Sequence, residues 1–339
     1  MPHQITIKPS NHVFAVNDGE TILEGALREG FVIAYGCRNG ACGTCKGRVL
    51  DGTVDYGKYQ EHALPDIEKK LGMALFCQAR PLTDLAIECR EIGAVKDIQI
   101  RTLPCRVQKM ERIAADVMML YLKLPANERL QFLAGQYIDI LMKDGGRRSL
   151  SMANPPHDDT LLQLHLRHYG GPFSNYVFNR MKEKEILRFE GPLGTFFLRE
   201  DSNKPIILLA SGTGFAPIKA IIEHMLHKGI KRPTTLFWGG RVRADLYMNE
   251  LGEKWQREDG IHYVPVLSEA RPDDNWRGRT GFVHRAVMKD FPDLSGHQVY
   301  TCGAPVMVEA AHEDFTARCK LPDEEFFSDS FTPAVPNSN

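Results

Sequence analysis

The chain has 339 residues, of which 43% are hydrophobic and 25% charged, and its 29 glycines and 20 prolines are spread along it. This composition is typical of a folded protein of two or three domains, and it excludes collagen-like, mucin-like and disordered chains. The 42 Lys and Arg residues nearly balance the 43 Asp and Glu residues, which gives a net charge of −1. Such a chain has no overall field that would attract nucleic acid or an anionic membrane, so we expect neither as a partner.

No segment of the sequence has the pattern of a membrane span or a secretory signal. The longest apolar runs, such as residues 117–122, are far shorter than the roughly 18 residues that cross a bilayer. The N-terminal residues Met1-Pro2-His3 include no basic region followed by an apolar run. We therefore expect a cytoplasmic protein without membrane insertion. In that reducing compartment the eight cysteines would be thiols or ligands, because they are too sparse for a disulfide scaffold.

The first ninety residues begin with short alternating strands and one helix. Residues 3–8 and 13–16 alternate apolar and polar side chains, which predicts a hairpin. A helix is expected to follow Thr21, because Thr21 and Glu24 have the spacing of a capping box and Gly30 is typical of a helix end.

Four cysteines have the spacing of an iron–sulfur site. Cys37, Cys42 and Cys45 form C-x4-C-x2-C, and Cys77 follows after an intervening segment, which is the plant-type pattern for a 2Fe-2S cluster. The loop contains small residues that let backbone N–H groups approach the inorganic sulfides. Structural zinc is the alternative, although zinc sites usually show two C-x2-C pairs and this loop has one. Three further cysteines are expected to be small buried residues: Cys89, Cys105 and Cys319.

The pattern changes twice further along the chain. Four strands with intervening turns predict an antiparallel barrel or sandwich: residues 103–110, 117–124, 136–142 and 161–167. After Lys204, apolar runs alternate with helical segments, which predicts a parallel α/β sheet: strands at 205–210, 234–238 and 298–302, and a helix at 218–227. We therefore expect a multidomain α+β and α/β chain with domains at residues 1–93, 100–200 and 204–330.

Two segments of the barrel region are candidate anion sites. Arg148 lies near the end of a strand in Arg147-Arg148-Ser149-Leu150-Ser151, and a guanidinium there is suited to a pyrophosphate. Gly170-Gly171-Pro172-Phe173-Ser174 is expected to begin a helix, and a helix N-terminus with glycines binds anions. Taken singly, the arginines also fit a solvated surface and the glycines an ordinary turn.

Two segments of the α/β region are candidate nucleotide sites. Gly212-Thr213-Gly214 follows a predicted buried strand, and its glycines allow a tight turn that exposes backbone N–H groups to a pyrophosphate. Pro217 stands where a dinucleotide fingerprint has its third glycine, so a plain βα turn remains an alternative. Cys302-Gly303-Ala304-Pro305 follows a later strand, where a cysteine could equally be a buried strand-end residue.

On these motifs the chain resembles a plant-type ferredoxin domain joined to a reductase of the ferredoxin–NAD(P) reductase superfamily. The resemblance implies a β-grasp ferredoxin domain, an antiparallel FAD-binding barrel and a parallel-sheet nucleotide domain. It implies that Arg148, Gly171 and Ser174 hold the FAD phosphates and that Ser151 reaches the isoalloxazine N5 region. Leu150 departs from the family pattern, which has an aromatic residue at this position, so altered FAD affinity or potential is expected.

The resemblance also assigns the nucleotide site. Gly212, Thr213 and Gly214 are expected at the pyrophosphate, and Cys302 and Gly303 near the nicotinamide. Ser268 and Glu269 lie in the region that contacts the adenosine ribose, where a carboxylate repels a 2′-phosphate, so NADH is expected rather than NADPH. Arg241 and Arg243 favour the opposite preference. Phe331, near the chain end, is the candidate aromatic contact to the flavin, with core packing as its alternative.

The implied function is an electron relay from NADH through FAD and a 2Fe-2S cluster to a protein that docks near the cluster loop. Ser151, Thr213 and Cys302 are the candidate catalytic residues around the hydride path, and no general base is assigned. CDP-6-deoxy-delta-3,4-glucoseen reductases and the reductase components of multicomponent oxygenases share this module order, and both remain open. A redox sensor or carrier without turnover is a third hypothesis, which rests on Leu150.

Overall fold

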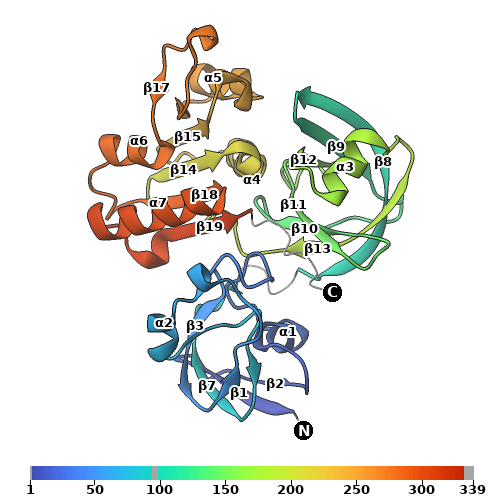
Figure 1. Cartoon of the computed structure of the whole chain (residues 1–339), viewed down its shortest axis with the longest axis vertical. Coiled ribbons are helices and arrows are strands. Elements are labelled where there is room, and N and C mark those ends of the chain that lie inside the picture. Colours follow the sequence, from blue (N-terminus) through green and yellow to red (C-terminus); the bar gives the residue numbers. More distant parts are fainter. Residues whose placement is uncertain (1, 94–97, 332–339) are drawn as a thin grey trace. The chain divides into compact units, whose positions relative to one another are not determined.

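The computed structural model describes residues 2–93 and 98–331. Two compact units are present, Met1–Gln99 and the unit that begins at Ile100, and each is described by itself (Figure 1). Over the described residues, no helix combines the length and the apolar character needed to cross a membrane.

The first unit is built on a mixed five-stranded sheet with a helix against it. Its strand order is β2-β1-β7-β3-β5: β2 (Val13–Val16), β1 (His3–Lys8), β7 (Leu85–Glu88), β3 (Lys46–Asp51) and β5 (Met73–Leu75). β1 pairs antiparallel with β2 and parallel with β7, so the predicted hairpin is confirmed and the N-terminal strand lies inside the sheet. The remaining elements are short: β4 (Val54–Asp55), β6 (Arg80–Pro81), η1 (Glu61–Ala63) and α2 (Asp66–Lys70).

Helix α1 (Ile22–Arg28) confirms the predicted capping box. The Glu24 backbone N–H donates to Thr21 Oγ1 at 3.2 Å, and the Thr21 N–H donates to a Glu24 carboxylate oxygen at 2.9 Å. These bonds satisfy donors that the first helical turn leaves free. Gly25 allows the helix to approach β2, because a Cβ there would lie 2.6 Å from a methyl group of Val16.

The first part of the second unit is a closed antiparallel barrel. Its strand order is β11-β10-β13-β8-β9-β12: β11 (Arg147–Ser151), β10 (Tyr137–Leu141), β13 (Ile186–Leu193), β8 (Arg101–Ala114), β9 (Val117–Lys123) and β12 (Leu162–Arg167). A bridge between Met152 and Leu164 joins the two ends of this sheet. Val107, Leu120 and Ile138 are fully buried inside the barrel. Helix α3 (Pro172–Asn179) follows β12, where the sequence predicted a helix.

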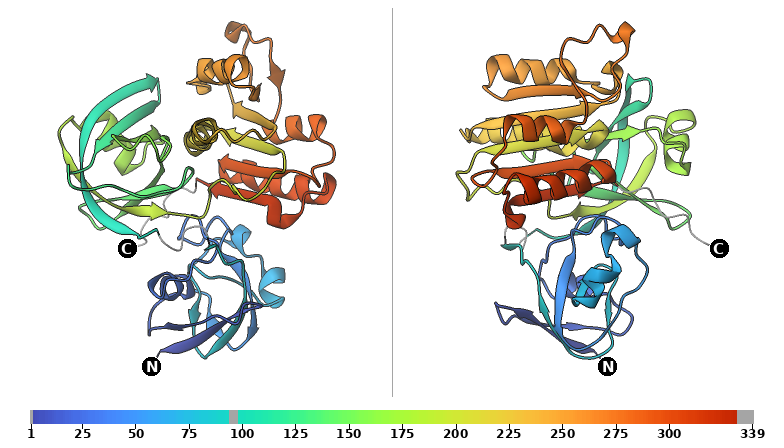
Figure 2. Two further views of the ribbon diagram at one scale, coloured as in Figure 1. Left: turned by 180° about the vertical axis from the view of Figure 1, so that it is seen from behind. Right: turned by 60° about the vertical axis from the view of Figure 1, so that its left-hand side comes forward.

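The remainder of the second unit confirms the predicted parallel α/β sheet, which has six strands and helices on both faces. Its strand order is β17-β16-β15-β14-β18-β19: β17 (Arg279–Thr280), β16 (His262–Leu267), β15 (Thr234–Gly240), β14 (Ile206–Ser211), β18 (Gln298–Gly303) and β19 (Phe326–Ser330). Helices α4 (Phe215–Lys228) and α5 (Asn249–Glu258) pack on one face, and α6 (Val283–Asp290) and α7 (Pro305–Arg318) on the other (Figure 2). Four 3-10 turns complete the domain: η3 (Gly212–Gly214), η4 (Arg243–Asp245), η5 (Pro272–Asp274) and η6 (Asp323–Glu325).

The direction in which strands are added reverses at β14, which has β15 on one side and β18 on the other. In open parallel sheets, ligands bind outside the carboxyl ends of the strands at such a switch point. Helix α4 begins there, three residues before the predicted start. Pro217 fits into its first turn, because the N–H groups of a first turn have no partner within the helix.

The barrel and the parallel sheet share part of one core. Ala134, Phe196 and Leu198 from the barrel side pack in the same cluster as Ile218 and Ile221 of α4. This contact fixes the end of the barrel beside the start of α4.

The prediction of three buried cysteines is wrong for one of them. Cys105 and Cys319 are buried, whereas Cys89 is half-exposed. Cys89 lies one residue beyond the end of β7, where the alternation of buried and exposed side chains stops.

Candidate functional site

The cluster loop holds its candidate cysteine ligands close together. The Cys37 N–H donates to Cys42 Sγ and the Cys42 N–H to Cys37 Sγ, both at 3.3 Å. Arg38, Gly40 and Gly43 have positive φ angles between 60° and 75°. Gly40 is required sterically, because a Cβ there would lie 2.8 Å from the Lys58 carbonyl oxygen.

The four cysteines form two pairs, and in each pair the pKa of one thiol is raised while that of the other is lowered. A hydrogen bond with Cys37 and burial raise the pKa of Cys42 well above its ordinary value, and a hydrogen bond with Cys77 and burial do the same for the pKa of Cys45. Charge on Cys42 also acts on both Cys45 and Cys77, so the two pairs lie near each other. Thiolates in such a place become stable when positive metal ions neutralise them, which fits an iron–sulfur cluster.

The Thr44 hydroxyl is a second feature that fits a cluster. Its oxygen is buried, and its interaction with the Cys42 thiol opposes the rise in the pKa of Cys42. It lies close to Gly36, where a Cβ would be 3.3 Å from Thr44 Oγ1 and 3.2 Å from Cys42 Sγ. A buried hydroxyl beside a candidate ligand is a donor suited to the sulfur of that cysteine or to an inorganic sulfide.

Two side chains from outside the loop hold its backbone, and sequence reasoning missed both roles. A His62 ring nitrogen lies 3.0 Å from the Ala41 carbonyl oxygen, and the Gln78 amide donates to the Arg38 carbonyl oxygen at 3.1 Å. Gln78 is adjacent to Cys77, so the same segment supplies the fourth candidate ligand and a brace for the loop.

The two arginines of β11 have different environments. Arg147 is paired with Glu190 at 2.9 Å and lies 3.6 Å from Asp139, so its charge is balanced by the protein. Arg148 donates to the Arg147 carbonyl oxygen at 2.6 Å and has no carboxylate partner within residues 2–93 and 98–331. Arg148 is therefore the guanidinium with charge available for an anion. Leu150, one residue before the strand end, is half-buried against the barrel core.

The glycine segment after β12 forms the start of α3. Gly171 is the N-cap, Pro172 occupies the first turn, and the buried Ser174 hydroxyl donates to the Gly171 carbonyl oxygen at 3.0 Å. No hydrogen bond or ion pair within the described ranges joins Arg148 to Gly171 or Ser174. They remain two separate candidate anion contacts on the barrel.

The end of the barrel and the end of the parallel sheet meet at Asp329. Ser151 Oγ donates to Asp329 Oδ2 at 3.3 Å, and Cys302 Sγ lies 4.0 Å from the same oxygen. Ser151, Cys302 and Asp329 are all buried. Burial and the nearby Asp329 carboxylate raise the pKa of Cys302 well above its ordinary value, so the thiol is neutral and unsuited to nucleophilic attack.

Asp329 was not among the predicted site residues. A sequence signal was present, since Asp329 lies two residues before Phe331, the predicted flavin contact. Phe331 itself is half-buried and packs against the core of the parallel sheet, and its N–H donates to the Gly303 carbonyl oxygen at 2.8 Å. Its position therefore fits the core-packing alternative.

The turn at residues 212–214 is fixed by close packing. Gly214 approaches the next strand so closely that a Cβ would lie 2.2 Å from the Cys302 carbonyl oxygen. The Trp238 indole N–H donates to the Gly212 carbonyl oxygen at 3.1 Å, and Trp238 stacks on Phe215 with ring centroids 3.8 Å apart. Thr213 is buried in this turn. The backbone N–H groups at the start of α4 are thus held at the switch point of the sheet.

The candidate adenosine end lies where β15 and β16 finish. The Glu269 N–H donates to the Arg241 carbonyl oxygen at 2.8 Å, and the Ser268 N–H donates to the Gly240 carbonyl oxygen at 2.9 Å. Both arginines of this segment have acidic neighbours. Arg241 Nε lies 3.5 Å from Asp245, and the Arg243 backbone N–H donates to an Asp274 carboxylate oxygen at 3.4 Å.

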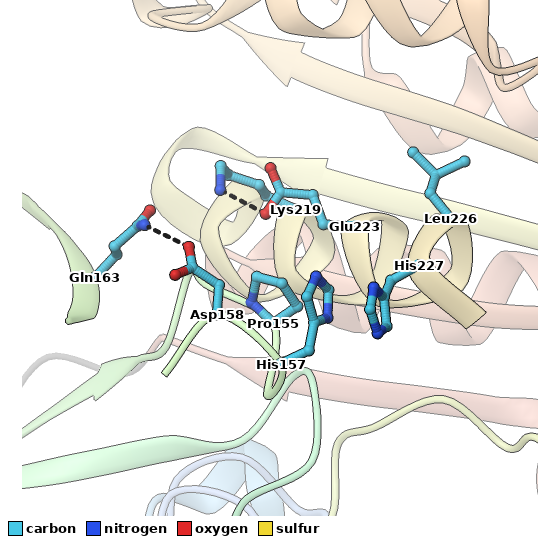
Figure 3. A pocket seen from close by; sticks show the side chains of 8 residues that line it. All are labelled: Pro155, His157, Asp158, Gln163, Lys219, Glu223, Leu226 and His227. Carbon is cyan, nitrogen blue, oxygen red and sulfur yellow. Dashed lines mark hydrogen bonds and ion pairs between the residues drawn. The ribbon is translucent and has the colours of Figure 1, made fainter. Parts of the chain in front are cut away.

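A hollow of about 550 Å³ lies between the 155–163 segment of the barrel and α4 (Figure 3). The imidazoles of His157 and His227 stack across it with centroids 3.6 Å apart. Lys219 is buried, pairs with Glu223 at 2.8 Å and donates to the Ala153 carbonyl oxygen at 3.1 Å. None of the predicted site residues lines this hollow.

Three family models match the chain in order. Residues 5–82 match a 2Fe-2S iron–sulfur cluster binding domain, residues 104–198 an oxidoreductase FAD-binding domain, and residues 208–313 an oxidoreductase NAD-binding domain. The cofactors are therefore a 2Fe-2S cluster, FAD and NAD(H).

Similar proteins match the chain over most of its length. The CDP-6-deoxy-L-threo-D-glycero-4-hexulose-3-dehydrase reductase of Yersinia pestis is 40% identical over 98% of this chain and 100% of its own length. The reductase component of phenol 2-monooxygenase from Pseudomonas sp. is 36% identical over 92% of this chain and 89% of its own. The crystal structure of a cytochrome P450 reductase from Amycolatopsis has a TM-score of 0.78 and 33% identity over 98% of this chain and 100% of its own. The chain belongs to the family of NAD-dependent 2Fe-2S flavoprotein reductases, which transfer electrons to a partner protein.

Proposed function

We propose that the electron acceptor is a dehydrase acting on a CDP-6-deoxy-4-hexulose, so that the reaction is reduction of the CDP-6-deoxy-delta-3,4-glucoseen intermediate on that enzyme. The observation that carries this proposal is the end-to-end match to the Yersinia pestis dehydrase reductase, at 40% identity over the relative's full length. The oxygenase reductase component matches at lower identity and over less of its length.

The proposed roles of the site residues follow from their environments. When bound, NADH would supply a hydride, FAD would split the electron pair into single electrons, and the cluster would carry them one at a time. We assign Cys37, Cys42, Cys45 and Cys77 to the cluster. Arg148 has charge available for the FAD pyrophosphate, and the start of α3 at Gly171 and Ser174 supplies N–H donors.

The hydride path is proposed to lie at the junction of β11, β18 and β19. The Ser151 hydroxyl is oriented by its bond to Asp329, and the neutral Cys302 thiol fills the space beside that carboxylate. Thr213 is held next to Cys302 by the packing of Gly214 against the Cys302 carbonyl. These side chains position the reactants and exclude water, which is how a cofactor enzyme contributes to hydride transfer.

NADH is the proposed nucleotide in preference to NADPH. The backbone bonds of Ser268 and Glu269 to residues 240 and 241 place a carboxylate-bearing segment beside Arg241. Arg241 is paired with Asp245, which reduces the positive charge left for a 2′-phosphate. A KM for NADH at least tenfold below that for NADPH is the expected result, and the reverse order would contradict this assignment.

The acceptor is proposed to dock beside the cluster loop, residues 37–45, in the cytoplasm, where thiols stay reduced. Single-electron transfer needs a short path from the cluster, and this loop surrounds the candidate ligands. No acceptor residue is assigned.

The test is NADH oxidation by the cofactor-loaded protein in the presence of the dehydrase and its CDP-sugar substrate, under anaerobic conditions. Dehydrase-dependent oxidation with formation of the reduced sugar supports the proposal. A Cys42→Ser variant is the control, because it loses cluster-dependent transfer while NADH still reduces ferricyanide through FAD. Rapid ferricyanide reduction without any dehydrase-dependent NADH oxidation would overturn the proposed acceptor.

The oxygenase hypothesis is the second candidate, and the structural match to a P450 reductase favours it. The same assay with a cytochrome P450 or a phenol monooxygenase component as acceptor separates the two. Failure of NADH to reduce either FAD or cluster would instead support a sensor or carrier, with Leu150 as the altered position in the flavin site.

A further inference from the structure

Arg167 is a buried cation at the junction of the flavin and nucleotide domains. It is the last residue of β12 and has a side chain only 8% exposed. Gly171, the N-cap of α3, follows four residues later, so Arg167 is directly connected to the candidate FAD phosphate segment. A buried guanidinium is costly unless carboxylates or other acceptors surround it.

The guanidinium of Arg167 reaches three different segments. Its Nε lies 3.2 Å from Asp116 in the turn between β8 and β9, inside the flavin domain. Its Nη2 donates to Asp245 Oδ1 at 3.2 Å, across the boundary to the nucleotide domain. Its Nη1 lies beside Gly212, where a Cβ would be 3.3 Å away. Among the described residues the buried Nε has no hydrogen-bond partner, so its contact with Asp116 is an ion pair without a well-formed hydrogen bond.

Asp245 extends this contact to the candidate adenosine end. Its second oxygen, Oδ2, accepts from the backbone N–H groups of Arg241 at 2.8 Å and Val242 at 3.3 Å. Burial opposes ionisation of Asp245, but these hydrogen bonds and the Arg167 charge outweigh it and lower its pKa. Arg167 therefore touches the pyrophosphate turn directly and the Arg241 segment through one ionised carboxylate.

We propose that Arg167 is a positioning residue that couples FAD binding to NAD(H) binding. FAD phosphates at residues 171–174 would fix the end of β12 and thereby the Arg167 side chain. The fixed guanidinium then holds Asp245 and adds positive charge beneath the 212–214 turn, where the nucleotide pyrophosphate binds. This inference depends on the FAD and NAD(H) sites alone and not on which protein accepts the electrons.

Coupling of this kind is reciprocal. If FAD tightens NAD⁺ binding by some factor, NAD⁺ must tighten FAD binding by the same factor. We expect a factor of about ten, which lies within the usual range for coupled sites. Two other contacts join the domains in this region: the Lys219 ammonium donates to the Ala153 carbonyl oxygen at 3.1 Å, and a His165 ring nitrogen lies 3.0 Å from the Tyr247 hydroxyl.

The informative variant is Asp245→Asn. Its amide oxygen can still accept the two backbone hydrogen bonds from Arg241 and Val242. Its NH2 group then faces Arg167, and because both groups are hydrogen-bond donors they cannot bond to each other. The variant therefore removes the contact between domains and keeps the local turn. Asp116→Asn is the matched control, because it removes a carboxylate at the same 3.2 Å distance within the flavin domain.

The measurement starts from the full-length holoenzyme. FAD dissociation is followed by flavin fluorescence with and without saturating NAD⁺, and NAD⁺ binding is measured by calorimetry on FAD-loaded and FAD-depleted chains. Wild type and Asp116→Asn are expected to show equal factors of about ten in both directions, and Asp245→Asn a factor near one. Arg167→Lys, checked by circular dichroism, is the second variant and is expected to lose most of the factor.

Two results would overturn the proposal. One is an unchanged coupling factor in Asp245→Asn or in folded Arg167→Lys. The other is an equal loss of the coupling factor in Asp116→Asn and Asp245→Asn. The effect would then come from removing any partner of the buried Arg167, and not from its contact with the nucleotide domain.

Discussion

Removal of the Asp329 carboxylate is expected to slow electron entry without emptying the cofactor sites. Asp329 is buried and accepts the hydrogen bond of the equally buried Ser151 hydroxyl at 3.3 Å. In Asp329→Ala that hydroxyl loses its partner, and a buried unsatisfied polar group costs about 1–3 kcal/mol. If this cost raises the activation free energy of hydride transfer, turnover drops by roughly 5- to 150-fold.

The assay is NADH-dependent ferricyanide reduction, which reports hydride transfer to FAD without needing the protein acceptor. FAD content and NAD⁺ affinity are measured in parallel and are expected to stay near wild type. Ser328→Ala is the matched control, because Ser328 precedes Asp329 on β19 and its side chain points to the other face of the sheet. Its turnover is expected to change less than about twofold.

A double-mutant cycle tests whether Ser151 and Asp329 act together. Each single alanine variant removes the same hydrogen bond, so the double variant is expected to be hardly slower than either single one, and the coupling energy should then equal the single-variant loss of about 1–3 kcal/mol. Losses that multiply in the double variant, or wild-type turnover in Asp329→Ala, would refute the assignment of Asp329 to the hydride path.

Three further predictions concern the turn, the cluster and a buried histidine. Gly214→Ala would place a Cβ 2.2 Å from the Cys302 carbonyl oxygen, so calorimetry is expected to show at least tenfold weaker NAD⁺ binding, whereas Gly296→Ala, with open space around it, binds normally. Cys42→Ser is expected to lose the visible cluster absorbance and Cys89→Ser to keep it, and a full cluster in Cys42→Ser would exclude Cys42 as a ligand. Burial and Lys219 lower the pKa of His165 to about 3, so the folded chain keeps this ring neutral while the unfolded chain protonates it below about pH 6.5. As the pH falls from 6.5 to 5, the free energy of unfolding should decrease by about 2 kcal/mol more in wild type than in His165→Asn. Urea titration measures this difference, and equal pH dependence in the two proteins would contradict the prediction.

Local patterns predicted the parts of the molecule that are local in sequence. Three candidate ligands lie within nine residues, and the capping box of α1 spans four, so each could be found from spacing alone. The strand patterns predicted the barrel and the parallel sheet for the same reason. Leu150 stands out only against a family pattern, and its half-buried packing on the barrel core leaves its effect on FAD to experiment.

The residues that sequence reasoning missed depend on strand order. Arg147 and Arg148 are equivalent in the sequence, and only the pairing of β10 with β13 and β11 shows that Glu190 and Asp139 neutralise Arg147. Asp329 becomes a site residue because β19 lies beside β18, which aligns it with Cys302. Neither strand pairing can be read from the spacing of residues along one strand.

Arg167 illustrates the same limit and its functional meaning. Its partners Asp116, Gly212 and Asp245 are 51, 45 and 78 residues away in sequence, and the three lie in separate segments. Arg167 is a buried cation that pairs with one carboxylate from each domain. The position of each domain therefore depends on the other, because the buried charge is costly when either carboxylate is removed. The two cofactor sites of this unit are therefore linked through a side chain that belongs to neither motif, and such links must be sought in the packing between motifs.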